Sequence, residues 1–326
     1  MYPFARSKVF WSLVADAVLL GVVGGLLALG FVAVVGVGTS LWWPENPDYG
    51  FLGGELWWLA VTTGAGLLVG WLRLATRVPA RPYGALAEIQ EARVDYKTAP
   101  QTVLVSAISL IGGASLGPFD AGVRSGGAIA EWWSARRGLD EQMRSINALS
   151  GMAAGVGALV TAPFVAALLN LELAKLKGRN VFMMLIPNVV AASAGFAVFW
   201  VTIGSTFLDV YEVGPYELEA WHLLAAIPLG AAAAAIMLAL SLVARLARRV
   251  VAAVDLNSVV LAGVGGMLFG VAGVLLPLTL FSGKEQLDDA VDQVGTIGAG
   301  LLVAVLVVKI VTFAISMATG FIGGPV

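Results

Sequence analysis

Six long apolar segments determine what this chain can fold into. They run through residues 9–41, 51–72, 181–208, 221–244, 256–280 and 295–319. Each reaches roughly 20 residues or more, the length that a helix needs to cross the hydrocarbon core of a membrane. A membrane β-barrel would instead require alternating apolar and polar residues. Hydrophobic residues make up 59% of the 326 and charged residues only 12%. The sequence therefore predicts an all-α polytopic membrane protein.

The charged residues separate into basic and acidic connections between these segments. Basic connections stay in the cytoplasm. Those of this chain are Arg6 and Lys8; Arg73, Arg77 and Arg81; Lys175, Lys177 and Arg179; and Arg245, Arg248 and Arg249. Acidic residues gather at 45–55, 209–219 and 285–292, which we expect to be external. We therefore predict a multi-pass protein of the cell membrane with a cytoplasmic N-terminus. The segment 134–145 carries both signs, and its side stays open.

Small residues recur at helical spacing within the apolar segments. Glycines lie four apart at Gly21 and Gly25, Gly66 and Gly70, Gly151 and Gly155, and Gly266 and Gly270. Such pairs let two helices approach closely inside a membrane. Their number favours a tightly packed bundle over loosely associated helices.

Glycine and proline interrupt the apolar sequence at two places, residues 112–122 and 320–326. Breaks of this kind free backbone N–H groups, which hydrocarbon does not tolerate unless they face protein or a hydrated cavity. They indicate a polar site within the bilayer. The chain has no cysteine and one histidine, and it lacks a phosphate-binding loop or a nucleophile motif. We therefore expect no enzyme activity, cofactor, metal or nucleic-acid partner.

Both breaks resemble motifs of CLC chloride channels and proton-coupled chloride exchangers. Residues 115–121, followed by 126–129, resemble the family's Gly-Glu-Pro motif and the helix after it. Residues 320–326 match its Gly-x-x-Gly-Gly-x-x motif, which Lys309 precedes as a basic residue often does in the family. Between them, residues 162–164 leading to Glu172 resemble its Asn-Ala-Pro-Leu stretch, and residues 281–283 its Ser-Gly turn.

This resemblance implies a CLC-like inverted-repeat bundle of tilted and broken helices, normally a homodimer. Residues 1–250 would form the first repeat with its connecting helices, and 251–326 part of the second. Helix N-termini attract anions, because they carry partial positive charge and free N–H donors. The implied pore and chloride-binding residues are Gly117, Phe119, Asp120, Ala121, Gly323, Gly324 and Val326, with Arg124 adding positive potential.

The chain departs from the family pattern at residues that carry protons. The gating glutamate of the exchangers falls at Phe119, unless an alignment shift of one places Asp120 there instead. Asp120 can equally pair with Arg124, four residues later on one helix face. Leu173, beside Glu172, stands where the exchangers have their second glutamate. The sequence thus predicts passive movement of a small inorganic anion without tight proton coupling, with chloride as the leading candidate.

Two other functions stay open. Asp120 could serve as the gate of a proton-coupled anion exchanger. Alternatively, the chain could be a non-transporting membrane scaffold derived from a CLC channel. The absence of a serine between residues 76 and 84, and the end of the sequence at Val326 within the second repeat, favour that scaffold.

Overall fold

The computed structural model is built almost entirely from helices. It describes residues 7–44, 47–78, 84–174, 181–204, 217, 219–284, 286–287 and 294–324. The helices are α1 (Lys8–Ser40), α2 (Trp58–Thr76), α3 (Gly84–Glu91), α4 (Ala99–Ile111), α5 (Phe119–Arg136), α6 (Glu141–Val160), α7 (Pro163–Leu173), α8 (Val181–Ile203), α9 (Ala220–Ala252), α10 (Ser258–Leu275), the 3-10 turn η2 (Pro277–Thr279) and α12 (Val294–Thr319). The all-α prediction is confirmed.

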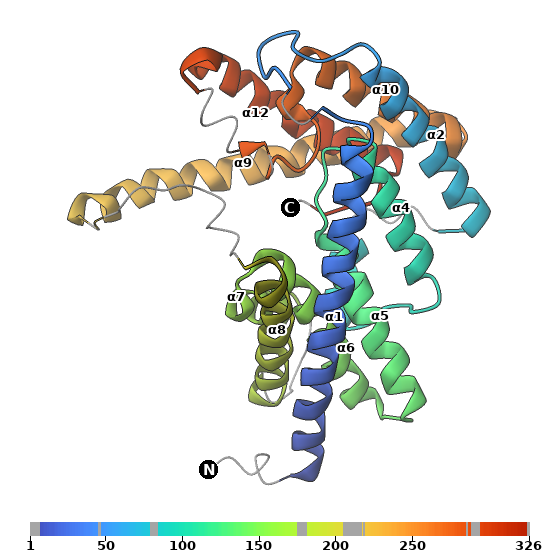
Figure 1. Ribbon diagram of the computed structural model, residues 1–326, viewed down its shortest axis with the longest axis vertical. Helices are drawn as coiled ribbons and strands as arrows, with labels where there is room; N and C mark the ends of the chain where they lie inside the picture. Colours follow the sequence, from blue (N-terminus) through green and yellow to red (C-terminus); the bar gives the residue numbers. More distant parts are fainter. Residues whose placement is uncertain are drawn as a thin grey trace.

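The helices form two packed groups that meet at α4 and α5 (Figure 1). In one group α1 packs against α5, α6 and α8, and α6 also contacts α7 and α8. In the other, α2 packs along α10, α10 contacts α12, and α9 lies against α12. Helix α4 contacts α1, α2 and α5, and therefore joins the two groups. The break after α4 consequently lies between them.

The predicted membrane spans are confirmed by length and composition. Six described helices are long and apolar enough to cross a bilayer: α1, α2, α8, α9, α10 and α12. None of the described helices between α3 and α8 is among these six. Helices α4 and α7 have 13 and 11 residues, shorter than a span, whereas α5 and α6 have 18 and 20.

Glycine lets these helices pack backbone against backbone, as the four-residue spacing of the glycines predicted. A Cβ atom at Gly70 would lie 2.5 Å from the Cα of Val259 on α10, and one at Gly25 would lie 2.9 Å from the Cα of Gly195 on α8. Gly151 and Gly155 of α6 meet α5 in the same way. The four predicted pairs all lie at such contacts. They therefore mark helix interfaces.

The turn between α5 and α6 lies at the same end of the molecule as the start of α1. Arg137 at the end of α5 forms an ion pair with Asp16 and donates to the hydroxyl of Ser12 at 3.1 Å, and both acceptors belong to α1. The Nε1 of Trp133 also donates to Asp16, at 3.1 Å. The side of segment 134–145, which the charges left open, is therefore that of the α1 N-terminus.

Candidate functional site

The two breaks come together in space and pair through their backbones. Gly117 and Gly324 form an antiparallel bridge in which each N–H donates to the other's carbonyl oxygen at 2.8 Å. The N–H of Ile322 donates to the hydroxyl of Ser109 on α4 at 3.1 Å. Gly323 fits closely as well, because a Cβ there would lie 2.7 Å from the Cβ of Leu116. One backbone structure at the start of α5 therefore contains both motifs.

The first turn of α5 presents backbone N–H groups without an internal acceptor. Pro118 is the N-cap residue and supplies no side-chain hydrogen bond. Its carbonyl accepts from Gly122, but no described residue accepts from the N–H groups of Phe119, Asp120 or Ala121. Such a helix start attracts anions through its N–H groups and its partial positive charge. Gly117 and Gly324 use their own N–H groups on each other, whereas the N–H groups of residues 119–121 and of Gly323 have no described acceptor.

Asp120 joins the N-termini of two helices. Its Oδ1 accepts a hydrogen bond from the N–H of Ala85, in the first turn of α3, at 3.0 Å. Its Oδ2 accepts from the Nε of Arg124 at 2.6 Å, which confirms the pairing considered from their spacing. Asp120 is only 4% exposed. Its buried carboxylate therefore connects α3 to α5.

Arg124 is shared between two carboxylates. Besides Asp120, it pairs with Glu88 of α3, whose Oε1 lies 2.7 Å from its Nη1. Glu131, further along α5, pairs instead with Arg144 of α6 at 3.0 Å. A Cβ at Gly84 would collide with the Arg124 guanidinium in its present position. The charge of Arg124 is thus paired with one carboxylate on α5 and one on α3.

Lys309 holds the chain after α10 against α12. Its Nζ donates to the carbonyl oxygens of Leu278 and Leu280, at 2.7 and 3.1 Å. The next residue, Phe281, donates its N–H to the carbonyl of Gly113 in the first break at 3.2 Å. Lys309 lies within α12 rather than near a helix end, where a lysine reaches the membrane surface. It therefore stabilises the irregular backbone beside the site.

Lys309→Met is expected to lower the free energy of unfolding by about 2 kcal/mol. The substitution keeps an unbranched apolar side chain but leaves the Leu278 and Leu280 carbonyls without their donor. Denaturant unfolding in detergent micelles would measure the loss. Lys97→Met, at an exposed residue, is the matched control and should change stability by less than about 0.5 kcal/mol. Equal stability of both variants would contradict this role.

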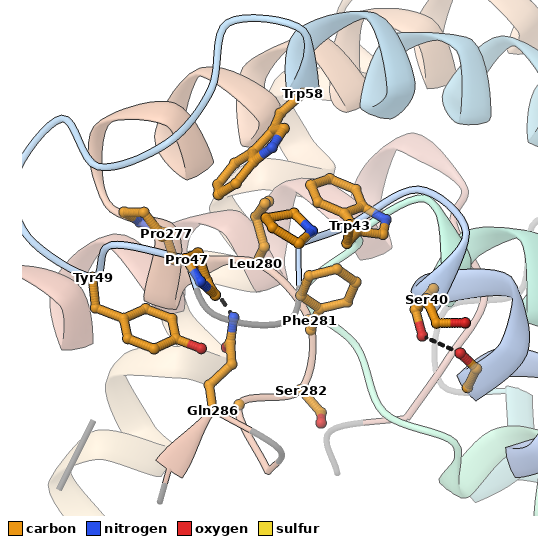
Figure 2. Close-up of a pocket in the computed structure, with 14 residues that line it drawn as sticks. Ser40, Trp43, Pro47, Tyr49, Trp58, Pro277, Leu280, Phe281, Ser282 and Gln286 are labelled. Atoms are coloured by element: carbon orange, nitrogen blue, oxygen red, sulfur yellow. Dashed lines mark hydrogen bonds between the residues drawn. The ribbon is translucent and has the colours of Figure 1, made fainter. Parts of the chain in front are cut away.

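A pocket of about 290 Å³ opens where α1 ends, beside the Phe281 turn (Figure 2). Trp43 packs edge-on against Phe281 and Trp58, with ring centroids 5.0 and 5.4 Å apart. Its Nε1 donates to the carbonyl of Ile111 at 2.8 Å, at the end of α4. The pocket thus adjoins the first break, but residues 119–121 do not line it.

The predicted site residues lie mainly together. Gly117, Phe119, Asp120, Ala121, Gly323 and Gly324 surround the α5 N-terminus, whereas Val326 lies outside the described residues. Sequence reasoning missed Glu88, whose short helix gave no signal of facing Arg124. It also placed Arg73 among exposed basic connections. The structure instead buries Arg73 at the second break, where its Nη1 donates to the carbonyl of Gly320 at 3.1 Å.

Comparisons with known proteins give a consistent picture. Relatives described as "Putative ion-transport protein YfeO" from Salmonella newport and Salmonella typhimurium are 29% identical over 339 residues, covering 99% of this chain and 78% of the relative. A slow cyanobacterial Cl⁻/H⁺ antiporter is similar in structure with a TM-score of 0.74 and 18% identity, covering 96% of this chain and 75% of that one. A CLC-type fluoride/proton antiporter gives 0.73 at 18% identity, covering 99% and 78%.

These structural similarities concern the fold, and they match the arrangement of broken and spanning helices described above. The family described as voltage gated chloride channel matches residues 65–326, which include both breaks and the Lys309 segment. The chain is therefore a multi-pass membrane protein that belongs to the voltage gated chloride channel, or CLC, family.

Proposed function

We propose that this protein moves a small inorganic anion across the cell membrane without tight proton coupling, and that this anion is chloride. One observation carries the proposal: the N–H groups of Phe119, Asp120 and Ala121 have no described acceptor where the two breaks meet. A helix N-terminus of this kind replaces part of an anion's hydration without a full cation. Broken helices also form the ion sites of many transporters.

The side chains at this turn favour uncoupled movement. Phe119 carries no titratable group. Asp120 does carry one, but Ala85 and Arg124 hold its carboxylate in place. A side chain with two donors from two helices is a poor candidate for a gate that must move during each transport cycle. The proposal therefore assigns transport to the α5 backbone and a structural role to Asp120.

The membership in the CLC family supports a transport function over catalysis. We further propose a homodimer with cytoplasmic N-termini. The division into residues 1–250 and 251–326 also stays a proposal. Helices α2 and α10, one from each part, pack directly against each other.

One observation favours a second candidate, a proton-coupled exchanger with Asp120 as its gate. The Asp120 carboxylate accepts from the first turn of α3, so it occupies a position where a helix N-terminus would attract a free anion. Two proteins of similar structure are described as Cl⁻/H⁺ and fluoride/proton antiporters. In this case a mobile anion and the Asp120 carboxylate would compete for the N–H groups at the N-terminus of α3.

Flux from liposomes distinguishes the two candidates. The purified chain is reconstituted with chloride inside and valinomycin to clamp the voltage, and chloride and proton movement are recorded together. We expect chloride efflux without proton movement, and the folded fraction of Asp120→Asn should keep it, because asparagine can still accept from Ala85. Opposed proton movement that Asp120→Asn abolishes would favour the exchanger. Absence of flux with chloride, nitrate and fluoride would overturn both candidates.

A further inference from the structure

Arg73 is a buried cation at the far end of the second break. It lies in the last turn of α2, only 8% exposed, and its Nη1 donates to the carbonyl of Gly320 at 3.1 Å. Gly320 has a φ of +103°, and a Cβ there would collide with the guanidinium. The chain therefore turns away from α12 directly against this arginine.

The guanidinium has more donors than partners. It carries five N–H groups, and the bond to Gly320 is the one recorded among the described residues. Its Nε is buried and has no acceptor among the described residues. A buried donor without a partner is costly, and a bound ion is one of the explanations that such a group calls for.

The charge of Arg73 is also uncompensated within the described part of the chain. Arg124, Arg137 and Arg144 each lie within 4.0 Å of a carboxylate, but Arg73 has no such ion pair. The C-terminus of α2 offers only about half a negative charge. An arginine inside a membrane protein is expensive unless it is paired, and it marks a functional site by default. A mobile anion would supply the missing negative charge.

Arg73 lies close enough to the first site to act on the same ion path. Gly320 lies four positions before Gly324, whose backbone pairs with Gly117 beside the α5 N-terminus. Four extended residues span at most about 14 Å. At a low effective dielectric constant, a full charge attracts an anion over that distance. The segment 320–324 therefore connects two groups that both favour anions.

We propose that Arg73 forms a second binding site for a small inorganic anion, at the Gly320 end of the break. The anion accepts hydrogen bonds from the unused guanidinium N–H groups and neutralises the buried charge. This proposal rests on the proposed function, because the same anion then occupies the α5 N-terminus. The site raises the local anion concentration at one end of the path, so transport saturates at lower chloride.

Bromide tests the site without requiring transport. Crystals of the chain soaked in bromide should give an anomalous peak beside the Arg73 guanidinium, and Arg73→Gln should remove that peak. In liposomes, Arg73→Gln should raise the half-saturating chloride concentration on the order of tenfold, since a hydrogen bond to a charged group is lost. Arg73→Lys, which keeps the charge, should recover most of that loss.

Arg77→Gln is the matched control, because it removes the same charge four residues later without a contact to Gly320. It should leave the peak and the half-saturation unchanged. A bromide peak at Arg73 in a protein without flux would support this site and overturn the proposed function. Flux with no peak at Arg73, and the same half-saturation in Arg73→Gln, would overturn the site alone. A purely structural role would lower stability in Arg73→Gln without moving half-saturation, which also overturns it.

Discussion

Arg124→Gln is expected to lower the free energy of unfolding by about 3–5 kcal/mol, the cost of breaking a buried ion pair by removing one partner. Arg124 lies within 2.6 Å of Asp120 and 2.7 Å of Glu88. Glutamine is shorter than arginine and carries no charge, so the buried carboxylate of Asp120 and the partly buried carboxylate of Glu88 would lose this ion pair. Denaturant unfolding in detergent micelles, followed by tryptophan fluorescence, measures the change.

Arg136→Gln is the matched control for this loss. It removes the same charge from the exposed end of α5, where the guanidinium stacks 4.6 Å from the ring centroid of Trp132. We expect a change below about 1 kcal/mol there. If both variants unfolded at the same denaturant concentration, the Asp120–Arg124–Glu88 cluster would not be a stabilising element.

Gly126→Val is expected to separate α5 from α6 and to destabilise the protein by about 3 kcal/mol or more. A Cβ at Gly126 would collide with the carbonyl of Gly151, and a Cβ at Gly151 would collide with Gly126 in turn. Both obstacles are backbone atoms, which cannot move aside as a side chain could. The expected result is aggregation or a shifted elution volume in size-exclusion chromatography, together with a lower unfolding temperature.

Gly64→Val provides the comparison, because a Cβ at Gly64 meets no atom within 4 Å. It makes the same chemical change on the exposed side of α2. A monodisperse Gly126→Val protein with the unfolding temperature of Gly64→Val would show that α5 and α6 tolerate a wider separation.

The sequence predicted those parts of the fold that depend on local composition. A run of apolar residues identifies a spanning helix because the bilayer imposes its length, and all six such segments are found as helices. Glycines four apart predicted close contacts because they lie on one helix face. The breaks were predictable because several glycines and a proline cluster there, which disfavours a continuous helix.

The sequence did not reveal partners that lie far apart along the chain. The pairing of Gly117 with Gly324 follows from no local pattern, and it removes two N–H groups that the motif alone had placed at the site. Arg73 was interpreted as part of a basic connection because it stands near Arg77 and Arg81 in the sequence. The structure buries Arg73 and exposes Arg77, whereas Arg81 lies outside the described residues. Counting charges does not distinguish a buried residue in the last turn of a helix from an exposed residue that follows this turn.

The pairing of the two breaks has a consequence for how the protein is made. Ser109 and Ile322 are 213 residues apart along the chain, and Arg73 and Gly320 are 247 apart. Synthesis adds about 5–20 residues per second and proceeds from the N-terminus. The α4–α5 break therefore enters the membrane well before its partner exists. The proposed anion site is therefore completed only after α12 has been inserted.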